Sequence, residues 1–373
     1  MKKQCAFLAL WLCSLPVLTA PKKDFTSSDW QLPSGNAGMT HFKGQESLYI
    51  QKGVALLGEE QLQNGVLEVD IADDDARGFA GLVFHHDGKG TYEEIYVRLH
   101  KAGQPDALQY APVYHQSNSW ALYPEHQATA TFASGEWTHL KVVIQGSTAA
   151  VYLNHADQPS LTVSDLKIKN QPKTRIGLKA LDGAYFSNFR FSPLPQVSAP
   201  LEAKTPDAPA AIMHWQVSQA LAIPQHHPSL FVLPDRKALT WENLPTEASG
   251  LLNIAAHRQK TSAEPMTETP ESYVWVKLEL ASDRPQLRQF FFEYSNKAQV
   301  FLNGQPLFYG DNSFRAKGLM FRGDIDKTLQ TNSLFLPLRQ GNNTILIALS
   351  SEANGWGLMG RLDRMAGIKL INP

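Results

Sequence analysis

The chain has 373 residues, of which 43% are hydrophobic and 18% charged, and its formal net charge is −1. This length is sufficient for two hydrophobic cores of ordinary domain size. Because the charge is nearly balanced and the basic residues are spread out, the composition excludes the strongly basic footprint of a nucleic-acid-binding protein, and we expect no nucleic acid partner.

The first 20 residues have the three parts of a secretory signal peptide. Lys2 and Lys3 form the positive start, residues 6–12 and 15–18 are apolar, and Thr19-Ala20 ends the segment with small residues. The apolar run is too short for a stable membrane span, so we expect export to the periplasm or the extracellular space. Cleavage after Ala20 would place Pro21 directly after the cut, which leaves the exact cleavage site open.

The leader also contains both cysteines of the chain, Cys5 and Cys13. A mature protein that has lost them can form neither a disulfide nor a catalytic thiolate nor a zinc–thiolate site. Any chemistry of the mature protein must therefore rest on carboxylates, histidines and aromatic side chains.

Within residues 24–193, apolar and polar side chains alternate along short segments, as they do in β-strands. Between residues 93 and 100, apolar side chains at 95, 97 and 99 alternate with polar or amphipathic ones at 94, 96, 98 and 100. This period of two predicts a strand with one face on a core and the other facing water. Residues 138–145 repeat the pattern and turn at Gly146-Ser147 into a second strand at 149–153, a predicted hairpin.

Residues 194–212 are rich in proline and alanine and are predicted to be an extended linker. Beyond it, residues 215–222 are predicted as a short helix, and residues 273–280, 289–294, 297–302 and 344–349 as strands, with Asn303-Gly304 as a tight hairpin turn. We therefore predict an all-β fold with two β-sandwich (jelly-roll) domains, residues 24–193 and 213–373, joined by a Pro/Ala-rich linker.

A series of segments in the first domain resembles the concanavalin A-like lectin/glucanase superfamily, and within it the laminin-G-like jelly rolls. These segments are Gly-Val-Leu-Glu-Val-Asp-Ile at 65–71, Gly-Phe-Ala-Gly-Leu-Val-Phe at 78–84, Gly-Glu-Trp-Thr-His-Leu-Lys-Val at 135–142, Ala-Val-Tyr-Leu-Asn at 150–154 and Ala-Tyr-Phe-Ser-Asn-Phe at 184–189. The resemblance implies a β-sandwich, but that fold hosts lectins, glycosidases and adhesion modules alike.

The second domain is similar to the galactose-binding-like jelly roll that is appended to secreted glycosidases. The similarity is carried by Tyr-Val-Trp-Val at 273–276, Ala-Gln-Val-Phe-Leu-Asn-Gly at 298–304, Gly-Asn-Asn-Thr-Ile-Leu-Ile at 341–347 and Gly-Trp-Gly at 355–357. It implies a second sandwich and a link to carbohydrates.

The polar face of the alternating strands is the predicted ligand site. Arg and Glu can hydrogen-bond sugar hydroxyls, and aromatic rings can stack on the C–H face of a sugar. The predicted ligand-binding residues are Glu94, Tyr96, Arg98, Tyr110, Tyr114, Trp120, His139, Lys141 and Tyr152. The alternative is a solvated sheet face with ordinary cross-strand pairs.

Catalysis is the weaker hypothesis, with Glu94, Glu68 and Asp70 as candidate carboxylates. Residues 68–73 resemble the Glu-x-Asp-x-x-Glu run of glucanases in this superfamily, in which carboxylates on one strand face act as nucleophile and acid/base. Here the third position is Asp73, and the segment lies early in the domain. An acidic, solvated strand end is the competing interpretation.

No metal site or cofactor is predicted. Adjacent histidines on a strand point to opposite faces, so His85-His86 cannot share one ion, and His226-His227 has no third ligand nearby. A structural calcium ion bound by Asp87 or Asp182 is kept as an alternative.

In the second domain, a sugar site at the ends of the loops is a second hypothesis. Its candidate residues are Tyr309, Phe314, Arg315, Phe321, Arg322 and Trp356, although a core position is favoured for Trp356.

These observations favour an exported carbohydrate-binding protein, accessory or lectin-like, without evident catalytic machinery. The alternatives are a glycoside hydrolase that acts through carboxylates of the first domain and an adhesion module that binds another protein.

Overall fold

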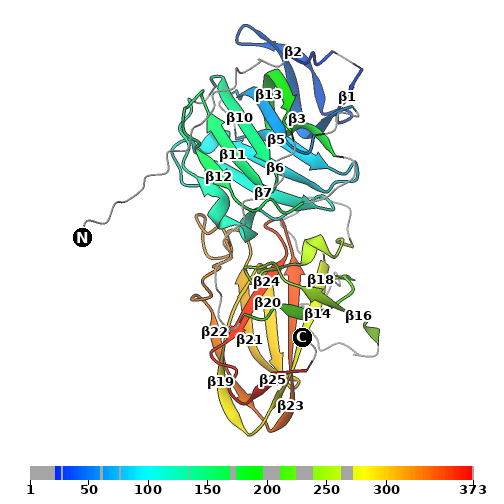
Figure 1. Ribbon diagram of the computed structural model, residues 1–373, viewed down its shortest axis with the longest axis vertical. Helices are drawn as coiled ribbons and strands as arrows, with labels where there is room; N and C mark the ends of the chain where they lie inside the picture. Colours follow the sequence, from blue (N-terminus) through cyan, green and yellow to red (C-terminus); the bar gives the residue numbers. More distant parts are fainter. Residues whose placement is uncertain are drawn as a thin grey trace, which may run out of the picture.

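The computed structural model describes residues 22–26, 28–58, 62–74, 77–133, 135–168, 174–195, 211–223, 238–261 and 272–371. The described residues form strands and short 3₁₀ turns, with no α-helix among them. The strands gather in two lobes that are stacked along the long axis of the molecule (Figure 1). The predicted all-β class with two β-sandwich domains is confirmed. The expected leader, most of the expected linker and His226-His227 lie outside the described residues.

The first domain contains strands β1 to β13. They are β1 (Trp30–Gln31), β2 (Ala37–Phe42), β3 (Gln45–Leu57), β4 (Gly65–Ala72), β5 (Phe79–His86), β6 (Tyr92–Arg98), β7 (Leu108–Tyr114), β8 (Ser117–Asn118), β9 (Gln127–Ala128), β10 (Thr138–Gln145), β11 (Thr148–Leu153), β12 (Leu161–Val163) and β13 (Arg175–Pro193). Three 3₁₀ turns, η1 (Leu99–Lys101), η2 (Trp120–Leu122) and η3 (Pro124–His126), lie in the loops around β7. The strands predicted at 138–145 and 149–153 form the expected hairpin.

The two long strands β3 and β13 run through both layers of this sandwich. The first half of β13 pairs with β5 and its second half with β4, and its register with β3 shifts between Leu181 and Ala184. The hydrogen-bonded order is β12-β11-β10-β4-β13-β5-β6-β7-β8. Because one hydrophobic cluster contains inward residues of β4 and β10 together with those of β5, β6 and β7, the sheet encloses a single core.

The second domain is a sandwich of two separate sheets. One has the order β16-β14-β18-β23-β20-β21 with β15 and β25 beside β18, and the other has the order β17-β24-β19-β22. The strands are β14 (His214–Ser218), β15 (Leu221–Ala222), β16 (Trp241–Pro245), β17 (Leu252–Asn253), β18 (Ser272–Ser282), β19 (Gln286–Tyr294), β20 (Asn296–Leu302), β21 (Gln305–Asn312), β22 (Ser333–Leu338), β23 (Gly341–Ser351), β24 (Gly357–Leu362) and β25 (Ile368–Leu370). The 3₁₀ turn η5 (Ile254–Ala256) precedes β18.

The helix predicted at 215–222 is wrong, since this segment forms strands β14 and β15. Trp215 and Val217 are fully buried and alternate with half-buried Gln216, which is the period of a strand. The core position favoured for Trp356 is confirmed, because its side chain is fully buried in the cluster between the two sheets.

The two domains are joined by a segment of the first domain that enters the second. Leu122 and Tyr123, in and after η2, are fully buried in one apolar cluster with second-domain residues, which are Leu251, Ile325, Leu329 and Met359. Backbone hydrogen bonds tie the same segment to the second domain, from Ile325 N to Ala121 O at 2.9 Å and from Ala121 N to Asn354 O at 3.3 Å. The domains therefore share a packed apolar joint.

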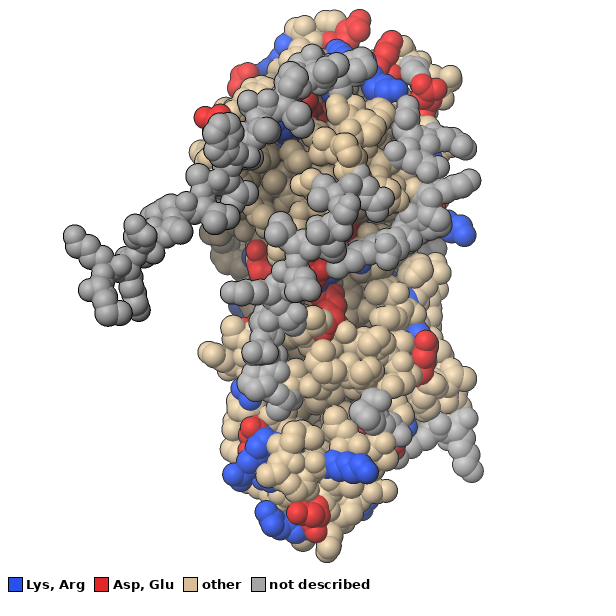
Figure 2. All heavy atoms as spheres, viewed as in Figure 1, with Lys and Arg blue, Asp and Glu red and all other residues tan. Residues whose placement is uncertain are grey.

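Charged side chains are dispersed over the molecule. On the face drawn in Figure 2, lysines and arginines are interspersed with acidic residues, and broad areas between them carry neither charge. This distribution agrees with the near-neutral composition.

Candidate functional site

The side chains of β5, β6, β7 and β13 that point away from the first core form one polar and aromatic surface, here called the β6 face. Cross-strand register explains the grouping: Tyr96 lies opposite Gly81 and Gln109, and Gly81 in turn lies opposite Lys179. The β6 face consists of Phe79, Glu94, Tyr96, Arg98, Gln109 and Lys179 from these strands, together with Asn118 of β8 and Trp120 of η2, which border them.

The strand alternation correctly placed Glu94, Tyr96 and Arg98 on one side of β6, but the expectation that this side faces water is wrong. The exposed fractions of these residues are 3%, 7% and 4%. All seven residues of β6 are buried. The half-exposed members of the face are Phe79, Asn118, Trp120 and Lys179.

Hydrogen bonds inside the protein fix the buried members of the face. The Arg98 guanidinium donates to the carbonyl oxygen of Asp106 at 2.5 Å, to the hydroxyl of Tyr96 at 3.1 Å and to the side-chain oxygen of Gln109. The amide of Gln109 donates to the carbonyl of Trp120 at 2.7 Å. Buried, fully bonded side chains of this kind hold the half-exposed groups around them in fixed positions.

Lys179 is the half-exposed cation of this surface, beside the buried Arg98, and sequence reasoning missed it. Its ammonium lies 2.5 Å from a carboxylate oxygen of Glu94, whose other oxygen accepts a bond from Asn118. Burial alone would lower the pKa of Lys179, but Glu94 and Tyr92 beside it raise this pKa above its usual value. Lys179 is therefore charged at neutral pH. The sequence did contain a feature that could have pointed to it, since Lys179 stands between Leu178 and Ala180 in an otherwise apolar strand.

Tyr110 and Tyr114 do not join the β6 face. Tyr110 lies opposite Ile95 and is fully buried, and its hydroxyl donates to Glu93, whose pKa burial raises to about 7. Tyr114 is half-buried at the end of β7 and packs against the core of the second domain. Both of these predicted ligand-binding tyrosines are used in packing and lie away from the β6 face.

His139, Lys141 and Tyr152 lie on β10 and β11, in the other layer of the sandwich. Since Leu140 and Val142 of β10 pack into the same core as Ile95 of β6, the outward side chains of the two layers point away from each other. The nine predicted ligand-binding residues therefore do not lie on one surface. A ligand-binding role for either group of residues stays a prediction.

Glu68 and Asp70 share the outward face of β4, as predicted, and both flank His139. Asp70 lies 2.7 Å from Nδ1 of His139, and Glu68 lies 3.8 Å from its Nε2. Asn188 donates to the second oxygen of Asp70 at 2.7 Å, and His155 stacks on the His139 ring at a centroid distance of 4.0 Å. Burial opposes the charged imidazolium, but the hydrogen bond to Asp70 and the nearby negative charge of Glu68 prevail and raise the pKa of His139 to about 9.

This raised pKa predicts a loss of stability at alkaline pH. Because the folded pKa lies above the ordinary value of 6.5, the ion cluster stabilises fully below pH 6.5 and loses its contribution as pH rises to about 9. After allowance for solvent screening, we expect the loss to be about 1–2 kcal/mol. Urea unfolding at pH 6 and pH 9 measures it. His139→Gln should remove this part of the pH dependence, and an unchanged difference between the two pH values would contradict the assignment.

In the described parts of the chain, no group of three or more His, Cys, Asp or Glu side chains could hold a metal ion. Asp87 accepts bonds from the backbone of Lys89 and Thr91, and Asp182 contacts Arg77. No described helix is long and apolar enough to cross a membrane.

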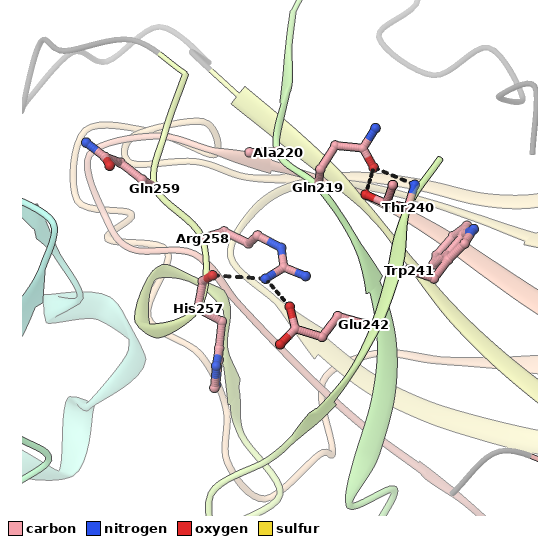
Figure 3. Close-up of a pocket in the computed structure, with 8 residues that line it drawn as sticks. All are labelled: Gln219, Ala220, Thr240, Trp241, Glu242, His257, Arg258 and Gln259. Atoms are coloured by element: carbon pink, nitrogen blue, oxygen red, sulfur yellow. Dashed lines mark hydrogen bonds and ion pairs between the residues drawn. The ribbon is translucent and has the colours of Figure 1, made fainter. Parts of the chain in front are cut away.

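A pocket of about 430 Å³ lies in the second domain, beside β14 and β16 (Figure 3). Glu242 and Arg258 point toward one another inside it and form an ion pair at 2.8 Å. Trp241 also lines the pocket, and it packs against the apolar cluster that contains Trp275. The lining is therefore a mixture of polar and apolar side chains, and none of the residues predicted from sequence belongs to it.

The fold and the β6 face define an all-β, two-domain protein with a preorganised polar and aromatic surface on its first domain. Residues 22–192 match the family model of the 3-keto-alpha-glucoside-1,2-lyase-like domain, which covers less than half of the chain. No curated protein matches the sequence.

Solved structures with a similar chain path have low identity to this protein. The carbohydrate-binding module CBM66 from Bacillus subtilis has 17% identity and a TM-score of 0.34, over 44% of this chain and 95% of that chain. A protein of unknown function with a galectin-like fold, also from Bacillus subtilis, has 11% identity and a TM-score of 0.35, over 48% and 97%. A xylan beta-1,4-xylosidase from Bacillus halodurans C-125 has 16% identity and a TM-score of 0.34, over 46% of this chain and 38% of its own.

Proposed function

We propose that the first domain binds a glycoside on the β6 face. The observation that carries this proposal is the match of residues 22–192 to a family model named for a glucoside-cleaving activity. The chemistry of the face supports it: Phe79 and Trp120 offer rings for the C–H face of a sugar, and Lys179 and Asn118 offer donors for hydroxyls. Buried Glu94 and Arg98 act as positioning residues that hold these groups in place.

Phe79→Ala should weaken glycoside binding about tenfold, because loss of a stacking ring costs about 1.5 kcal/mol. Phe79 is half-buried on β5, with the Tyr96 ring 6.4 Å away, so truncation removes contact surface and opens no deep cavity. A glycan array followed by titration calorimetry on a positive glycan measures the effect.

Phe335→Ala on β22 is the matched control, since this phenylalanine is 59% exposed and belongs to the second domain. It should bind as the parent does. If the parent binds no glycan, or if Phe79→Ala binds with unchanged affinity, the proposal for the β6 face is refuted.

The second candidate is glycoside cleavage by elimination, which the name of the matching family model favours. In such a reaction a base takes the C2 proton that a 3-keto group acidifies, the C1–C2 double bond forms, and the C1–O bond breaks with protonation of the leaving oxygen. The Lys179 ammonium is the charge on the β6 face that could stabilise the enolate. Ultraviolet detection of the enone from a 3-keto glucoside tests this candidate, and an unreacted substrate refutes it.

We also infer that the protein is exported, on the basis of the leader at residues 1–20. Cell fractionation followed by amino-terminal sequencing tests this inference, and protein found only in the cytoplasm with Lys2-Lys3 intact would contradict it. The adhesion hypothesis is separated from glycan binding by the same glycan array.

A further inference from the structure

A cluster of cations lies where the two domains meet, at one end of the β6 face. A single carboxylate oxygen of Asp106 contacts Lys101 at 2.6 Å, Arg98 at 3.7 Å and Arg322 at a shorter distance. Arg322 belongs to the second domain, in the loop between β21 and β22. Its contact with Asp106 therefore brings a charge from one domain to the surface of the other.

The cluster carries more positive than negative charge. In direct ion pairs, three cations share the carboxylates of Asp106 and Asp324, the latter 2.8 Å from Arg322. Glu94 also acts on Arg98 but is itself paired with Lys179. Burial and the positive charges of Arg322 and Arg98 together lower the pKa of Lys101 to about 8. This is the response expected where cations are crowded and incompletely neutralised.

The cations remain accessible in part, and an aromatic ring borders them. The side chains of Lys101 and Arg322 are 32% and 20% exposed, whereas that of Asp106 is 8% exposed. The indole of Trp120 lies 4.9 Å from the Arg322 guanidinium, and Phe314 of the second domain meets its edge at 6.0 Å. A ligand that extends along the β6 face past Trp120 would reach Lys101 and Arg322.

We propose that Lys101 and Arg322, supported by Arg98 behind them, form a subsite for the anionic group of an acidic glycan. This inference rests on the proposed glycoside-binding function of the β6 face. A carboxylate or sulfate on a sugar would receive charge-assisted hydrogen bonds there, and the sugar unit that carries it would lie beside Trp120. Because Arg322 comes from the second domain, the subsite is complete only when both domains are present.

The test uses the full mature chain and three oligosaccharide probes of equal length: a neutral galacto-oligosaccharide, an oligogalacturonide and a sulfated galacto-oligosaccharide. We expect at least one acidic probe to bind about five- to tenfold more tightly than the neutral probe, with a preference that decreases as salt rises. The two acidic probes distinguish carboxylate from sulfate.

Arg322→Gln should abolish the preference for the acidic probe and leave binding of the neutral probe unchanged, and Arg322→Lys should restore most of it. Arg315→Gln is the matched control, because Arg315 is an exposed arginine of the same loop that contacts the Phe314 ring. Thermal unfolding of each variant separates loss of the subsite from loss of the domain joint.

Equal binding of neutral and acidic probes, with no effect of Arg322→Gln, would overturn the anionic subsite and leave the proposed function intact. No binding of any probe, together with no effect of Phe79→Ala on any glycan, would overturn both. A uniform loss of binding in Arg322→Gln with a lowered unfolding temperature would overturn the subsite in favour of a structural role.

Discussion

Leu122→Ala should lower the free energy of unfolding by about 2–5 kcal/mol, the range for a fully buried leucine in a core. Leu122 is completely buried between the domains, beside Leu251 and Met359 of the second domain. A Cβ placed on Gly355 or Gly357 would lie 3.0 or 2.9 Å from atoms of Leu122, so the side chain packs directly against their backbone. Because those backbone segments belong to a sheet and its adjoining turn, they cannot easily collapse into the cavity.

Equilibrium unfolding in urea measures the loss, and limited proteolysis shows whether the domains separate. The parent should unfold with the domains coupled, whereas the variant should show a second transition as the joint weakens. Leu287→Ala is the control, since this leucine of β19 is 56% exposed and should change stability by less than about 0.5 kcal/mol. An equally small effect of Leu122→Ala would show that the apolar joint contributes nothing to stability.

Local sequence patterns predicted most strands because strand formation depends on alternation and turn residues. The range 138–145 matches β10, and Asn303-Gly304 forms the expected turn, with both residues at positive φ of 52° and 87°. The wrong prediction of a helix at 215–222 has a local reason as well. A short apolar segment fits the period of a helix or of a strand, and only its burial between neighbouring strands decides between them.

The candidate site was only partly predictable, because sheet order is a non-local property. Alternation placed Glu94 and Arg98 on one face, but nothing near β10 indicates that His139 belongs to the opposite layer. The contact between Asp106 and Arg322 joins residues 216 positions apart in sequence. Arg322 was a candidate within its own domain, and its place beside the β6 face follows only from the packing of the two domains.

The expected linker gave no hint of that packing. A Pro/Ala-rich connection predicts two domains that move independently. The structure instead has the amide of Asn253 within 3.1 Å of both Ser119 and Tyr123 across the joint, and Trp120 donates to the carbonyl of Ala353 at 3.1 Å. Residues that sequence analysis assigned to ligand binding are thus also part of the interdomain contact.

Lys179→Met should destabilise the protein by about 3–5 kcal/mol, the range for removal of one partner of a buried ion pair. The side chain of Glu94 is 4% exposed, so without Lys179 its charge would stay buried with the hydrogen bond from Asn118 but without its ion-pair partner. Glu94→Leu should cost less, because the Lys179 side chain is 20% exposed and water can solvate its ammonium in part. The Glu94→Leu/Lys179→Met variant should regain much of the loss.

Urea unfolding of the four proteins forms a double-mutant cycle that isolates the interaction between the two side chains. The pair Lys43–Glu136 is the matched control, since its N–O distance is also 2.5 Å but its side chains are 39% and 61% exposed. Its coupling should be about 0–1 kcal/mol, as for other exposed pairs. The same four proteins serve the binding assay: if the pair positions the ligand-binding groups of the β6 face, the double variant recovers stability but does not recover glycoside affinity. Recovery of both would assign Glu94 and Lys179 to folding alone and move the ligand to other residues of the face.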